Sequence, residues 1–155
     1  MPPRRHPTRS RAALVALASL AVVGAAGLGA CSKDGGSKAE FCAQVQVVPS
    51  LETVIARFSE TDPAVLDDRI DRARAAYHDL EDAAPKEIHG DTAEVVAVVD
   101  EVLDAVAAHP SDPAKATAAL RAKVKQHPKV GAARARVVRY AKAECDVVLD
   151  GTLGG

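Results

Sequence analysis

The feature that most constrains the fold is the spacing of apolar residues, which recur every three or four positions through most of the chain after Ala39. Such spacing places apolar side chains on one face of an α-helix. The clearest run follows Asp62-Pro63, a cap residue and a proline suited to a first helical turn. It comprises Leu66, Ile70, Ala73, Tyr77, Leu80 and Ala84. We therefore predict a long helix beginning at Pro63.

Four further segments have the same spacing. The first, residues 41–58, passes through Pro49, whose ring removes one backbone donor, so we expect a kink or short break there. The others are expected over residues 86–106 (or from Asp91, if the chain breaks at Gly90), 113–124 and 129–148. Residues 94–99, "EVVAVV", have high strand propensity, but their stripe continues to Val106 and favours a helix. Because short connections make consecutive helices antiparallel neighbours, the sequence predicts an all-α, up-and-down bundle of four to five helices over residues 40–150.

The first thirty residues have the composition of an export signal. Four arginines and no acid precede residues 12–30, which carry no charge, the order found in secretory signal peptides. The uncharged run is mostly Ala and Gly, so its insertion as a permanent membrane span would be weakly favourable. We predict a cleaved signal over residues 1–30, and residues 151–155, "GTLGG", as a disordered tail.

The end of this segment, Leu28-Gly29-Ala30-Cys31, resembles a bacterial lipobox, the sequence recognised by the lipoprotein signal peptidase. The resemblance implies cleavage before Cys31 and a diacylglyceryl thioether, with acyl chains such as palmitate, on its sulfur. Two or three acyl chains anchor a protein stably where one does not. Residues 31–39 are polar and contain two glycines, as expected of a flexible lipidated tether. The alternative is an ordinary cleaved signal that leaves Cys31 as a structural thiol.

With Cys31 assigned to the lipid, two cysteines remain, Cys42 and Cys145. In an exported protein such a pair most simply forms a disulfide. It would close a loop of about 100 residues, for which chain entropy predicts about 4 to 5 kcal/mol of stabilisation. A metal pair and a reactive thiol are the alternatives, and no histidine lies within five residues of either cysteine. The disulfide requires the first and last helices to be neighbours, since bridged Cα atoms lie within roughly 7 Å of each other.

Charge is distributed unevenly along the chain. Residues 31–155 carry a formal net charge of −5, yet residues 113–143 contain nine Lys or Arg and no acid, whereas residues 51–104 hold fifteen acids against five bases. The basic segment either pairs with the acidic helices, at up to about 1 kcal/mol for each exposed pair, or faces an anionic partner or surface. The candidate basic surface comprises Arg121, Lys125, Arg134, Arg136 and Arg139.

Catalytic and metal-binding motifs are lacking. We find no nucleophile elbow, phosphate-binding glycine loop, H-E-x-x-H, C-x-x-C or Ca²⁺-loop spacing. Glu87, His89 and Asp91 could converge on a metal only if Gly90 opened the backbone, because positions two apart do not share a helix face. His109 and His127 each precede a proline at a predicted helix end, where an imidazolium suits the helix dipole. We therefore predict no catalytic residue, no metal site and no cofactor.

Three short motifs suggest a family. The segments "EFC", "AAPKEI" and "RYAKAEC", between Glu40 and Cys145, are similar to segments of small, uncharacterised, all-helical lipoproteins and secreted proteins of actinobacteria. The resemblance implies a helical fold and a location on the extracytoplasmic face of the cell membrane, and it implies no activity. Asp146 stands where such helices are expected to end in Gly.

These observations together predict a lipid-anchored, non-enzymatic module of the cell envelope that binds or supports another envelope component, either a protein or an anionic polymer. The alternative is a carrier of a small ligand or metal with its site between helices. Nucleic acid is not an expected partner, because no aromatic residue is interleaved with the bases of residues 113–139.

Overall fold

The computed structural model describes residues 35–149, which are all-helical. The predicted signal peptide, Cys31 with its lipobox, and the predicted tail at residues 151–155 lie outside the described residues. The elements within them are α1 (Lys38–Val45), α2 (Leu51–Ile55), a short 3₁₀ helix (Phe58–Glu60), α3 (Pro63–Asp82), α4 (Lys86–Ala108), α5 (Pro113–Val124) and α6 (Val130–Cys145).

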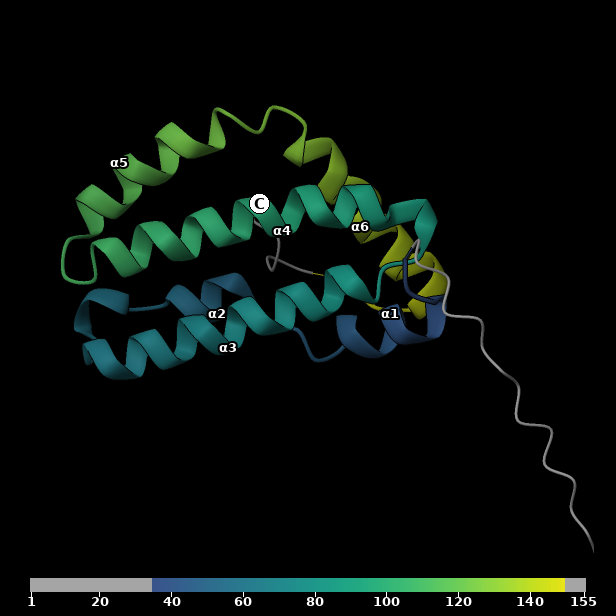
Figure 1. The fold of residues 1–155 in the computed structure, drawn as a ribbon, viewed down its shortest axis with the longest axis horizontal. Helices are drawn as coiled ribbons and strands as arrows, with labels where there is room; N and C mark the ends of the chain where they lie inside the picture. Colours follow the sequence, from purple (N-terminus) through teal and green to yellow (C-terminus); the bar gives the residue numbers. More distant parts are fainter. Residues whose placement is uncertain (1–34, 150–155) are drawn as a thin grey trace, which may run out of the picture. The chain divides into compact units, whose positions relative to one another are not determined.

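Helix α4 is the centre of the helical unit and packs against α3, α5 and α6. Helices α3 and α5 lie on opposite sides of it, and α6 crosses it to end beside α1 (Figure 1). Its apolar stripe is broad because it faces neighbours on several sides. The stripe supplies many of the buried residues, including Ile88, Val95, Val96, Val99, Val102, Leu103 and Val106. The prediction that residues 94–99 are helical is confirmed, since burial against neighbouring helices outweighs their strand propensity.

Both Asp-Pro pairs begin a helix as predicted. Asp62 accepts hydrogen bonds from the backbone N–H groups of Ala64 and Val65, and Asp112 accepts one from that of Lys115. In each case the proline occupies the first helical position, where its missing N–H costs nothing. These caps fix the starts of α3 and α5.

The first predicted helix is divided further than expected. The chain leaves helical geometry after Val45 and re-enters it at Leu51, and Arg57, in the left-handed conformation with φ 51°, separates α2 from the 3₁₀ helix. Pro49 explains the first interruption, because a proline disfavours helical geometry in the residue before it as well as removing a donor. The described bundle therefore has six α-helices in place of four to five.

Two other boundaries differ from the sequence prediction. Helix α4 continues through Gly90 without a break, and α6 ends at Cys145, before the predicted Val148. Asp146 caps α6 in the left-handed conformation, with φ 54°. Aspartate tolerates this conformation better than most residues, so it serves here where a glycine was expected.

The predicted disulfide between Cys42 and Cys145 is confirmed. The two Cα atoms lie 5.2 Å apart, so the bond joins α1, the first helix, to the end of α6, the last. Beside it Phe41 is fully buried, and its ring meets Tyr140 edge-on at 5.5 Å between centroids. This part of the core thus combines a covalent link with aromatic packing.

The segment before α1 is fastened to the turn between α3 and α4. The N–H of Gly36 donates to the carbonyl of Ala84 at 2.9 Å, and Ser37 and Glu40 form a capping box at the start of α1. Helix α1 therefore begins two residues before the predicted domain boundary at Glu40, and Lys38 and Ala39 belong to it and not to a tether. Among the helices of residues 35–149, none combines the length and apolarity that a bilayer crossing needs.

Two glycines provide a matched test of this packing. A Cβ at Gly36 would lie 2.3 Å from the carbonyl oxygen of Ala83, whereas a Cβ at Gly90, inside α4, meets nothing within 4 Å. We expect Gly90→Ala to stabilise the fold by about 0.5 to 1 kcal/mol, because alanine favours a helix over glycine. Gly36→Ala should lower the melting temperature, because the backbone of Ala83 must move. Thermal unfolding followed by circular dichroism measures both, and equal effects of the two variants would contradict the close approach at Gly36.

Candidate functional site

The charged residues of α4 divide between its two sides. On the α3 side, Arg74 donates to Asp100 at 3.1 Å and to Asp104 at 2.7 Å. On the other side, Asp91 and Glu101 face the basic helices α5 and α6. The acids of α4 are therefore shared between two groups of partners.

Arg136 makes a two-bond contact that joins the basic part to the acidic part. Its Nε and Nη2 each donate to one oxygen of Asp91, both at 2.5 Å. The Asp91 side chain is only 19% exposed. Hydrogen bonding to the Arg136 guanidinium holds the pKa of the Asp91 carboxyl below its ordinary value, and the same contact raises the pKa of Arg136. This planar, two-bond geometry is the one that arginine forms with carboxylates.

His127 is placed between two glutamates of α4. Its Nδ1 lies 3.4 Å from Glu94 Oε1 and its Nε2 lies 3.5 Å from Glu101 Oε2, and the imidazole is 20% exposed. Lys123 adds a third contact, 3.7 Å from Glu101 Oε1. The connection between α5 and α6 is thus held to the middle of α4.

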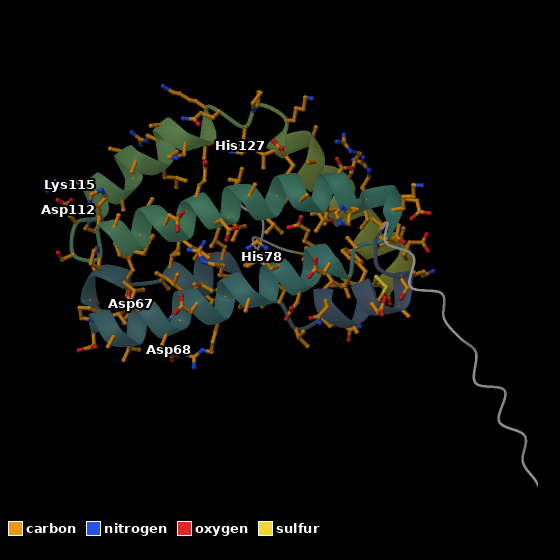
Figure 2. The ribbon with its side chains drawn as sticks, in the orientation of Figure 1. Asp67, Asp68, His78, Asp112, Lys115 and His127 are labelled. Carbon is orange, nitrogen blue, oxygen red and sulfur yellow. A yellow bond between two sulfur atoms is a disulfide. The ribbon has the colours of Figure 1, made fainter. Side chains whose placement is uncertain are left out.

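His78 makes an equivalent contact on the opposite side of α4 (Figure 2). Its Nε2 lies 3.0 Å from Asp100 and its Nδ1 lies 3.7 Å from Glu81. Sequence reasoning had given His127 only a role at a helix end. The signal that was available is the spacing of Glu94 and Glu101, seven residues apart and hence on one helix face.

The five residues of the candidate basic surface do not form one uniform face. Arg121, Lys125 and Arg139 are exposed and have no ion-pair partner within the part of the chain that the structure describes. Arg134 is half-buried, and its Nε is buried with no hydrogen-bond partner among residues 35–149. Arg136 is engaged by Asp91. Some bases of the segment are therefore paired with α4, as the first interpretation predicts, whereas others face solvent.

The metal hypothesis gains no support from the geometry. Because α4 is continuous through Gly90, Glu87, His89 and Asp91 do not share a helix face, and Asp91 is bound to Arg136. Within the described residues, no group of three or more His, Cys, Asp or Glu side chains could hold a metal ion. What the α5–α6 side can do chemically is attract anions through exposed guanidinium and ammonium groups.

A pocket that sequence reasoning missed lies elsewhere, between α2 and α3. Val47 and Pro49 of the preceding connection, Val54 of α2, and Ala73 and Ala76 of α3 contribute to its lining. The available signal was the pair of alanines three positions apart on the inner part of α3, which leaves space beside a helix.

The Asp91–Arg136 pair should make part of the free energy of unfolding depend on pH in the acidic range. Because the pKa of Asp91 is lowered in the folded state, the pair stabilises the fold above the unfolded carboxyl pKa of about 3.9. That stabilisation is lost as the pH falls through the lower folded-state pKa. Asp91→Asn should lower the urea midpoint at pH 7, and the difference from the parent protein should shrink below about pH 4. Asp67→Asn, at an exposed position on α3, serves as the control, and a pH-independent difference would refute the assignment.

Comparisons of the chain with protein-family models, with curated proteins and with solved structures each find no match. The resemblance to small actinobacterial lipoproteins therefore stays a prediction.

Proposed function

We propose that this protein is a lipid-anchored helical module of the cell envelope, without catalytic activity, that binds another envelope component through exposed cations of α5 and α6. The observation that carries the proposal is the surplus of bases on this side of α4. Of the nine bases in residues 113–143, three make ion pairs with Asp112, Glu101 or Asp91. The others have no such pair within residues 35–149: Arg121, Lys125, Lys129, Arg134, Arg139 and Lys142.

The surplus follows from how the acids of α4 are used. Asp100 and Asp104 are engaged by Arg74 of α3, so they do not neutralise the bases across α4. Exposed cations without partners contribute little to folding and repel one another. Their concentration on one side of the domain is therefore better explained by binding than by stability.

The exposed cations occur as helix-surface neighbours. Arg121 and Lys125 are four residues apart at the end of α5, and Arg139 and Lys142 are three apart on α6, so each pair projects from one helix face. Clusters of this kind increase the local concentration of anionic partners and accelerate their association. An anionic protein or polymer of the envelope fits this surface.

The proposed anchor would hold one end of the helical unit near the membrane. Gly36 is fixed to Ala84 at the turn between α3 and α4. Five residue steps separate it from Cys31, so a lipid on Cys31 would hold that turn within about 18 Å of the attachment point. Arg121 and Lys125 flank Lys123, which contacts Glu101, so they lie beside the middle of α4 and not at the turn that the anchor would hold.

Charge reversal tests the basic surface. We expect Arg121→Glu combined with Lys125→Glu and Arg139→Glu to reduce the yield of cross-linked envelope partner at least tenfold, measured by cross-linking in the native envelope and mass spectrometry. A control reverses Arg57 and Lys86, which are exposed outside α5 and α6. An unchanged set of partners in the α5–α6 variant would contradict the proposal. So would loss of binding to anionic liposomes with full retention of the cross-linked partner, because the cations would then serve the membrane alone.

The anchor is tested by the intact mass of protein isolated from membranes after expression of the full chain. We expect a chain that begins at Cys31 and carries a diacylglyceryl group there, while Cys42 and Cys145 react with thiol reagents only after reduction. Cys31→Ala should shift the protein out of the membrane fraction. A chain that retains residues 1–30, or a free thiol at Cys31 in membrane-bound protein, would overturn the anchor.

A further inference from the structure

The pocket is lined by α2, α3 and the connection before α2. Helices α2 and α3 lie on the side of α4 opposite α5 (Figure 1). The volume of the pocket is about 620 Å³. This value falls within the range of roughly 300 to 1,000 Å³ that is typical of small-molecule sites. The pocket shares no residue with the basic surface, so it requires a separate explanation.

The pocket exists because small side chains face an interrupted helix. Ala73 and Ala76 of α3 line it, and Ala73 is buried. Opposite them, the chain leaves α1 and passes through Pro49 before α2 begins, so no continuous helix fills the space beside these alanines. Larger side chains at these two positions would narrow the pocket.

The walls of the pocket are fixed in place. The hydroxyl of Tyr77, which is fully buried, donates to the carbonyl of Pro49 at 2.9 Å. Burial raises the pKa of Tyr77 to about 12, so the phenol remains a donor at neutral pH. On the next turn Ser50 caps α2 by accepting from the N–H of Thr53 at 3.1 Å. A pocket with preformed walls loses little entropy when a ligand binds.

Part of the lining is apolar surface left in water. Val47 is 70% exposed, the highest value among the exposed large hydrophobic residues of the described chain. Pro49 and Val54 continue this surface inward, and Val54 is buried at 3% exposure. Covering such surface with a hydrocarbon chain is favourable by about 25 cal/mol for each Å² removed from water.

The charged groups of the lining are cationic. Arg69 and Arg72 lie three residues apart on α3, and none of the residues that line the pocket is acidic. Arg69 Nη1 makes two long contacts, at 3.4 and 3.5 Å, with the carbonyls of Val54 and Ala56, which leaves other N–H groups of its guanidinium for a ligand. Arg72 pairs with Asp68 at 2.9 Å, but both side chains are well exposed, so an anionic ligand can compete for it.

We propose that this pocket binds a single-chain anionic amphiphile. Its hydrocarbon chain lies against Val47, Val54 and Ala76, and its carboxylate or phosphate accepts hydrogen bonds from Arg69 and Arg72. This binding site is additional to the partner surface on α5 and α6. It gives the module a second role as a carrier of an amphiphilic small molecule.

The test uses protein purified after expression of the full chain and four twelve-carbon probes: dodecanoate, dodecyl phosphate, dodecanol and dodecyltrimethylammonium. Isothermal titration below the micelle concentration should show that one or both anionic probes bind at least tenfold more tightly than the neutral and cationic probes. Which anion binds more tightly identifies the head group as a carboxylate or a phosphate. Equal binding of the cationic probe, or no binding of any probe, would overturn the proposal.

Variants locate the site. Ala76→Leu, which narrows the pocket, and Arg69→Gln combined with Arg72→Gln should each weaken anion binding at least tenfold. Ala122→Leu and Arg121→Gln, exposed changes of the same kinds on α5, should leave it unchanged. Val47→Ser changes an exposed lining residue, so weaker anion binding in this variant cannot come from disturbed core packing. Undiminished affinity in Ala76→Leu and Val47→Ser would place the amphiphile elsewhere and refute the site. The α5–α6 charge reversal should not alter amphiphile binding, so failure here is distinguishable from failure of the partner surface.

Discussion

The covalent bond between Cys42 and Cys145 is the constraint on which the arrangement of this domain depends. Helix α1 has eight residues, and an isolated helix of that length is not stable in water. Closing a loop of about 100 residues removes unfolded conformations worth about 4 to 5 kcal/mol in chain entropy. The bond also brings Phe41 against Tyr140. The short first helix is therefore retained by its connection to α6, and it carries the start of the described chain to the turn between α3 and α4.

Within this closed loop, α4 determines both the packing and the electrostatics. Its buried residues are mostly valines, which remove less apolar surface from water per residue than Leu or Phe, so the helix must contact neighbours on several sides. The acids at the edges of its apolar stripe meet basic groups from all three neighbours: Arg74 and His78 from α3, Lys123 from α5, and Arg136 from α6. The acid-free segment is thus complementary to α4 only in part, and the remaining cations face water.

The features that could be predicted from the sequence are those that depend on a local pattern of residues. The starts of α3 and α5 follow from Asp-Pro caps, the helical class from apolar spacing, and the disulfide from counting cysteines. Residues 46–50 were harder, because a continuous stripe across Pro49 does not reveal how far the helix unwinds. The partner of Arg136 was beyond prediction, since it depends on how α4 is rotated against its neighbours. The pocket was missed because two alanines on a helix indicate space only when the opposing chain fails to fill it.

The two proposed binding regions can act at the same time because they share no residue. The pocket is lined by α2, α3 and the connection before α2, whereas the exposed cations belong to α5 and α6. Each side has its own polar connection to α4, Arg74 with Asp100 on one and Arg136 with Asp91 on the other, and no residue is common to both. An amphiphile at Arg69 and Arg72 therefore leaves the contacts of α6 in place. The regions are nevertheless linked through the core, because Val54 and Ala73 of the pocket belong to the same buried cluster as Ala133 of α6. The Cys42–Cys145 bond adds a covalent link from α6 to the helix that precedes Val47. Communication between the regions would require a shift of this close-packed cluster, which dense packing opposes.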